Sequence, residues 1–131
     1  MKPGRRPSSG LTDRELEIMT IFWTKGPLYV RDMLEFFPEP RPHVNTVSTI
    51  VRILEEKGHV AHNNISGSHQ YYAVTPQDEY RKKSMGRIVS DFFNNSYKMA
   101  VSALVEEEKV SVDELREIID MIERRDKKQE D

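Results

Sequence analysis

Cysteine is absent from the 131-residue sequence. Without thiols the chain can form neither a disulfide framework nor a cysteine-ligated zinc ribbon, and it has no thiol nucleophile. Long apolar runs are missing too, since none approaches the ~20 residues that a membrane-spanning helix needs. The basic N-terminus leads into no apolar stretch of the signal-peptide kind. We therefore expect a cytoplasmic protein that does not associate with a membrane.

Motifs of enzyme chemistry are also missing. The sequence has no glycine-rich phosphate loop, no nucleophile elbow and no HExxH zinc motif. The acidic run at residues 106–108 is typical of a solvated helix end. His59 and His62, with His43 and His69, could suggest a metal site, but the first two enter a strand and would face opposite sides. We expect no enzyme activity, no cofactor and no metal site.

Hydrophobic residues make up 37% of the sequence and charged residues 32%. This balance favours a thin, mostly helical protein over one with the thick core of an enzyme. Residues 1–76 have nine Lys or Arg against eight Asp or Glu, whereas residues 77–131 have eleven against fourteen. The asymmetry has the sign expected of a DNA-binding first half, but it is too weak to carry that inference alone.

The first half of the chain has the pattern of a helical head. Residues 1–10 are predicted to be a disordered leader. Apolar residues then recur at helical spacing in three segments, at residues 12–25, 30–37 and 43–58. Thr12 and Glu15 form a capping box at the start of the first segment. Pro38 ends the second segment, because proline cannot continue a helix.

Two short strands follow, at residues 60–64 and 70–74, around a turn at residues 65–68. Three helices and then a hairpin is the order of a winged helix-turn-helix. We therefore predict a winged-helix DNA-binding domain at residues 11–76. The expected fold class is mainly α with a small β wing, followed by a helical dimerisation arm.

The second half has three further helical segments, at residues 76–93, 97–107 and 111–123. Thr75 is predicted to cap the first of them, and Ser111 and Glu114 form a second capping box. The last segment has one narrow apolar stripe, which usually needs a partner. We predict a helical dimerisation domain at residues 77–123 and a charged tail at residues 124–131 that frays.

The helix at residues 43–58 has the design of a reading helix, with a core side and a face of short polar side chains. Base edges in the major groove offer partners to such a face: Asn pairs with adenine, Arg with guanine, and Thr contacts the thymine methyl. Acidic residues are expected only beyond the groove-facing turns, at Glu55 and Glu56. The predicted DNA-binding residues are Arg41, His43, Asn45, Thr46, Ser48, Thr49, Arg52, His62, Asn63, Ser68, His69 and Gln70.

Within that set, Asn45 and Arg52 are assigned to base reading and Arg41 and Thr46 to phosphate contacts. A second copy of the chain is the simplest cover for the apolar stripes of the second half. The predicted dimerisation residues are Ile88, Phe92, Phe93, Val101, Leu104, Leu115, Ile118, Ile119 and Ile122. Two alternatives remain: a winged-helix adaptor that binds protein instead of DNA, and a second half that packs back on the head.

Several segments together resemble the penicillinase and methicillin-resistance repressors, the BlaI/MecI type. They are LTDRELEIM at residues 11–19, Trp23, KGPL at 25–28, NTVST at 45–49, RILEEKG at 52–58, YYAV at 71–74 and LVEEEKVS at 104–111. The resemblance extends in register over residues 11–123. It implies a homodimer that binds an inverted-repeat operator in double-stranded DNA and represses transcription, including that of antibiotic-resistance genes.

The resemblance also implies a signal. In several members of the family, a sensor-linked protease triggers cleavage in the arm, and the corresponding bond here is Ala103–Leu104. Members that are cleaved have Asn before the bond and Phe after it, so this chain departs from their pattern. A copper-responsive branch uses C-terminal cysteines, which this chain lacks.

Overall fold

A computed structural model describes residues 10–130. Except for Gly10, the predicted leader lies outside the described residues. The chain divides into two units, Met1–Ser84 and Met85–Asp131. No helix within residues 10–130 is long and apolar enough to cross a membrane. Six α-helices, one 3-10 helix and one two-stranded antiparallel sheet are described there, which confirms the predicted fold class.

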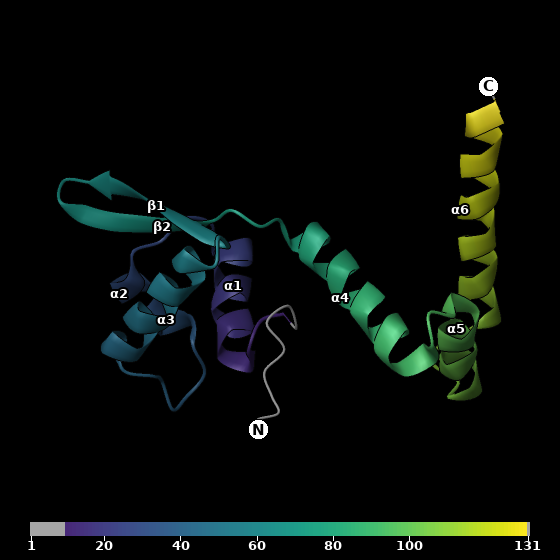
Figure 1. The fold of residues 1–131 in the computed structure, drawn as a ribbon, viewed down its shortest axis with the longest axis horizontal. Coiled ribbons are helices and arrows are strands. Elements are labelled where there is room, and N and C mark those ends of the chain that lie inside the picture. Colours follow the sequence, from purple (N-terminus) through teal and green to yellow (C-terminus); the bar gives the residue numbers. More distant parts are fainter. Residues whose placement is uncertain (1–9, 131) are drawn as a thin grey trace. The chain divides into compact units, whose positions relative to one another are not determined.

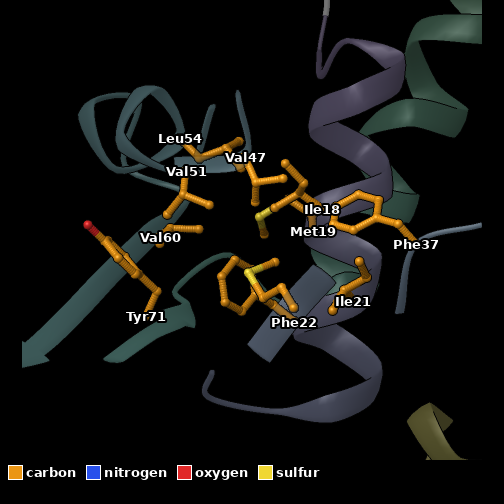
Figure 2. Close-up of a cluster of buried hydrophobic side chains, with 11 residues drawn as sticks. Ile18, Met19, Ile21, Phe22, Phe37, Val47, Val51, Leu54, Val60 and Tyr71 are labelled. Atoms are coloured by element: carbon orange, nitrogen blue, oxygen red, sulfur yellow. The ribbon is translucent and has the colours of Figure 1, made fainter. Parts of the chain in front are cut away.

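The first unit contains α1 (Asp13–Lys25), α2 (Val30–Met33), η1 (Leu34–Phe36) and α3 (Val44–Glu56), followed by the hairpin of β1 (Val60–Ile65) and β2 (Ser68–Ala73) (Figure 1). Its core lies where α1, α3 and the hairpin meet. Figure 2 shows the core side chains pointing toward one another. The buried set is Ile18, Met19, Ile21, Phe22, Met33, Phe37, Val47, Val51, Leu54, Val60 and Tyr71.

The capping box that starts α1 is confirmed. The backbone N–H of Glu15 donates to Thr12 Oγ1 at 3.1 Å, and the N–H of Thr12 donates to Glu15 Oε1 at 3.0 Å. The second predicted helix is shorter than expected and tightens into η1 after Met33. Phe37 is extended because it precedes Pro38, whose ring disfavours helical backbone in the residue before it.

α3 begins one residue later than predicted. His43 is its N-cap, and its Nδ1 accepts from the backbone N–H of Asn45 at 3.0 Å. Val47, Val51 and Leu54 have no exposed surface. The helix ends at Glu56 rather than at Gly58, where φ is +88°. One face of α3 is thus fixed in the core, and the opposite face is left to solvent.

The wing is tighter than the sequence indicated. Ile65 pairs with Ser68, so that the turn has two residues and not four. Ser66 and Gly67 both have positive φ, as the favoured two-residue hairpin turn requires. A short bridge joins Leu28 to Tyr71, with N–H···O distances of 2.9 and 2.8 Å in the two directions. This bridge fixes the base of the wing next to α2.

After β2, the chain enters α4 (Gln77–Phe93). Thr75 does not cap this helix as predicted. The carbonyl of Pro76 accepts the helical bond from Tyr80 N–H, and the Thr75 hydroxyl lies 2.8 Å from His59 Nδ1 instead. Trp23 Nε1 also donates to the Thr75 carbonyl at 2.9 Å. The position of Thr75 is therefore set by long-range contacts, which sequence alone does not display.

The second unit comprises the end of α4, α5 (Tyr97–Glu106) and α6 (Val112–Glu130). The capping box at Ser111 and Glu114 is confirmed by two hydrogen bonds of 2.9 and 3.0 Å. The prediction that the chain frays from residue 124 is wrong, because α6 continues to Glu130. The last turns consist of Arg, Asp, Lys, Gln and Glu, most of which are good helix formers even when they bury nothing.

The Glu15 carboxylate also connects α1 to the end of α3. Lys57 Nζ donates to its two oxygens at 3.1 and 2.8 Å. The Glu15 side chain is 6% exposed and that of Lys57 is 44% exposed. Burial alone raises the pKa of Glu15, but the hydrogen bonds from Lys57 and Thr12 and the Lys57 charge outweigh it and lower the pKa below 4.5. The pair therefore stabilises the fold while Glu15 is ionised.

We predict that Lys57→Met lowers the free energy of unfolding by about 2 kcal/mol at pH 7, because it leaves a buried carboxylate without its cation. The contribution of Glu15 is complete above pH 4.5 and is lost as the pH falls through the lowered pKa, so the deficit shrinks in acid. Urea unfolding at pH 7 and at pH 3.5 measures both effects. As a control, Lys83→Met breaks an exposed ion pair with Glu79 and changes stability by about 0.5 kcal/mol or less. Equal effects of the two variants would contradict the prediction.

His59 predicts a second pH effect. Its pKa is lowered from 6.5 by burial and then by the charges of Lys57 and Lys83, against the opposing effect of Glu15. The native state thus favours the neutral ring. Its contribution is complete above the unfolded pKa near 6.5 and is lost as the pH falls through the lowered pKa. His59→Gln should therefore lose less stability than the wild type between pH 7 and pH 5 in thermal unfolding. An unchanged pH dependence would exclude His59 as the cause.

Candidate nucleic-acid interface

The solvent face of α3 carries the polar side chains that the sequence assigned to DNA. Asn45, Thr46, Thr49 and Arg52 are exposed, and Ser48 is half-buried. The Thr49 hydroxyl donates to the carbonyl of Asn45 at 2.9 Å, and Arg52 Nη2 donates to Thr49 Oγ1 at 3.5 Å. These contacts follow from the helical spacing of three and four residues. They hold Arg52 along the helix, with its guanidinium still open to a base or phosphate.

An open groove of about 720 Å³ lies between α2, α3 and the wing. It brings together five of the predicted residues from separate parts of the sequence: Ser48, Arg52, His62, Ser68 and His69. Three further polar side chains line it from the start of α2 and the residue before it, and sequence analysis did not identify them: Tyr29, Arg31 and Asp32. These three residues could have been predicted from the sequence, because the helix before a reading helix ordinarily crosses the DNA backbone.

The remaining predicted residues lie elsewhere on the first unit. Arg41 is exposed and forms an ion pair with Glu39 at 3.3 Å. His43 caps α3. Asn63 and Gln70 pair across the hairpin, and the side chains of neighbouring strand residues alternate between its faces. These two therefore point away from the face that carries His62 and Tyr71.

His62 has several partners inside the groove. Its Nδ1 lies 2.7 Å from Glu55 Oε2. Its ring stacks on His69 with centroids 4.0 Å apart and an angle of 11° between the planes. Tyr71 meets the two imidazoles edge-on, at 5.4 and 6.0 Å. Glu55 also lines this groove, one helical turn after Arg52.

The groove is electrostatically mixed. Arg31 and Arg52 supply positive charge, and Asp32 and Glu55 supply negative charge. Burial raises the pKa of the Tyr71 hydroxyl, Glu55 raises it further, and Arg52 opposes them. Tyr71 is therefore a neutral hydrogen-bonding group at physiological pH. Among residues 10–130, no three His, Asp or Glu side chains are arranged to hold a metal ion.

The second unit presents a different kind of surface. Val89 is the one fully buried hydrophobic side chain among its described residues. Phe92 is 76% exposed. Six other predicted dimerisation residues are also exposed: Ile88, Val101, Leu104, Ile118, Ile119 and Ile122. Phe93 and Leu115 are half-buried. Apolar surface of this extent marks an interaction site.

Sequence analysis missed some of this surface. Met85, Tyr97, Met99, Val112 and Met121 are each more than half exposed. A shallow groove of about 350 Å³ on α6 is lined by Ile118, Met121, Ile122, Arg124 and Arg125. The bond between Ala103 and Leu104 lies within α5, where the Ala103 carbonyl accepts from Glu107 N–H at 3.1 Å.

Comparison with known proteins gives matches that span both units. The family model described as penicillinase repressor matches residues 11–124. The methicillin resistance regulatory protein MecI of Mammaliicoccus sciuri is 23% identical over 109 residues, which cover 82% of this chain and 89% of that protein. The protein of the same name from Staphylococcus aureus (strain N315) is 22% identical over the same coverage.

Proposed function

The chain belongs to the penicillinase repressor family, which confirms the sequence resemblance, and on this basis we propose that it is a homodimeric repressor of an inverted-repeat operator. Members of this family are DNA-binding regulators of transcription rather than enzymes. The observation that carries the proposal is the construction of α3. Val47, Val51 and Leu54 on one side of this helix are fully buried, whereas Asn45, Thr49 and Arg52 face solvent.

In this proposal α3 enters the major groove, which is wide enough for one α-helix. Asn45 and Arg52 read base edges, since their amide and guanidinium groups pair bidentately with adenine and guanine. Arg41 and Thr46 contact phosphates at the start of the helix. The wing residues on the α3 side, Ser68 and His69, lie along the adjacent backbone.

The proposed dimer forms through the second unit. A single buried hydrophobic side chain, Val89, is too little for an independent core, and a second copy of the chain would cover the exposed isoleucines of α6. Dimerisation also compensates for the small net positive charge of the winged-helix half, residues 1–76. Two heads on adjacent half-sites act as a bivalent ligand, so the second binds at high effective concentration.

The proposed setting follows from the relatives. The MecI proteins are named for methicillin resistance, and we extend to this chain the control of an antibiotic-resistance gene in the cytoplasm. Inactivation by a sensor-linked protease at Ala103–Leu104 is part of the same proposal. Because that bond is held in a helix, α5 must unwind before a protease can reach it.

The first experiment is a gel shift with the purified full chain and the DNA upstream of its own gene, at about 50 and 200 mM salt. We expect a discrete complex that weakens with salt and resists non-specific competitor DNA. If the folded dimer gave no such complex, and none appeared with a pool of random duplexes, the repressor proposal would fail. The winged-helix adaptor would then be favoured.

Arg52→Ala tests the reading face. We expect a loss of about 1–3 kcal/mol in operator binding and relaxed preference at one base pair, because a bidentate contact to guanine is removed. Arg81→Ala on α4 is a matched control, since it removes an equally charged and exposed side chain away from α3. Competition gel shifts with single-base operator variants give both quantities. Unchanged binding by Arg52→Ala would show that the reading face is elsewhere.

Ile119→Asp tests the dimer. A carboxylate in the centre of the apolar α6 surface is costly to bury, so we expect monomers in sedimentation equilibrium at concentrations where the wild type is dimeric. Ile65→Asp, at the tip of the wing, makes the same change at a similarly exposed isoleucine and should remain dimeric. A dimer that persists in Ile119→Asp would place the interface on another face.

A further inference from the structure

The Glu55–His62 contact joins the reading helix to the wing. It is a short hydrogen bond of 2.7 Å between α3 and β1, and both side chains are 31% exposed at the edge of the groove. An ionised carboxylate only accepts hydrogen bonds, so Nδ1 of His62 must carry the hydrogen. The stack on His69 and the edge contact with Tyr71 hold the ring in this orientation.

Glu55 places a negative charge in the groove between α2, α3 and the wing, next to the proposed DNA-binding face. Its carboxylate repels phosphates, and it lies three residues after Arg52, a spacing at which opposite charges on a helix attract each other. A Glu55 side chain free to turn toward Arg52 would compete with DNA for the guanidinium. In the structure, the carboxylate is bound to His62 instead, and Arg52 bonds to Thr49.

We propose that Glu55 and His62 are a positioning pair, which sets the wing against α3 and keeps the Glu55 carboxylate away from Arg52. The pair acts on recognition through Arg52 and the wing, and it need not touch DNA itself. The inference rests on the proposed DNA binding. It adds two residues whose contribution is to specificity, whereas phosphate contacts contribute to affinity for any sequence.

The hydrogen bond between Glu55 and His62 gives this role a distinctive readout. A substitution that keeps a donor and an acceptor at these two positions should keep the preference for one sequence, whereas a substitution that removes the hydrogen bond should lower it.

The ring of His69 stacks on that of His62, so His69→Gln accompanies the test as a control for the loss of this stack. Glu56→Ala is the matched control for Glu55→Ala, because it removes the same charge from the next residue of α3, which is exposed. Any general gain of affinity from the lost negative charge is common to both variants.

The experiment uses the full chain. Its ligand is the DNA duplex that the wild-type protein selects most strongly from a pool of random 40-base-pair duplexes. Competition binding against poly(dI-dC) gives the ratio of specific to non-specific affinity. For Glu56→Ala, we expect this ratio to stay close to that of the wild type. For Glu55→Ala, it should be about tenfold lower than for Glu56→Ala.

Two conservative variants separate positioning from simple loss of structure. Glu55→Gln keeps a hydrogen-bond acceptor for His62, so it should recover most of the ratio. His62→Gln keeps a donor for Glu55, so it should also recover most of the ratio, whereas His62→Ala should lose as much as Glu55→Ala.

The outcomes are distinct from those of the functional proposal. If no duplex is enriched, the proposed DNA binding fails. If a duplex is enriched but Glu55→Ala matches Glu56→Ala, the positioning pair is wrong. A ratio for Glu55→Gln that is as low as that for Glu55→Ala would also overturn it, because restoring the acceptor would then have no effect.

Discussion

The first unit depends on one carboxylate. Glu15 closes the capping box that starts α1, and it binds Lys57 at the end of α3. One buried group thus fixes the beginning of one helix and the end of another, 42 residues later in the chain. α1 also covers the apolar side of α3, so this contact supports the arrangement in which the polar side of α3 faces solvent. The exposure of that polar side is therefore a consequence of how the core is closed, and not only of the residues on it.

The two units meet different demands, and the first, Met1–Ser84, is the longer. Among its described residues, the first buries eleven hydrophobic side chains around α1, α3 and the wing. The second buries Val89 among its described residues and leaves large apolar side chains of α4, α5 and α6 in solvent. Such a division suits a protein in which one unit recognises a ligand and the other recognises a copy of itself. In the proposed dimer, the near-neutral charge of the chain matters little, because the placement of the charges and the bivalency of the two heads compensate for it.

Features governed by neighbouring residues could be predicted from sequence. The capping boxes at Thr12 and Ser111, the three-helix head and the hairpin all follow from local spacing, and the structure contains them. The errors arose where distant contacts decide. The hydroxyl of Thr75 contacts His59 and its carbonyl accepts from Trp23, and both partners are distant in the sequence. The helical tail of α6 was missed for another reason, since a charged sequence without an apolar stripe was equated with disorder.

The only tryptophan of the chain, Trp23, donates its indole N–H to the Thr75 carbonyl where the wing passes into α4, and its ring lies against Tyr80. Indole emission therefore originates from a single place, the junction between the head and the helix that leads to the second unit. Any event that loosens this junction changes the polarity around one known fluorophore. The protein thus contains its own optical probe, positioned where a signal received by one unit would have to pass to reach the other.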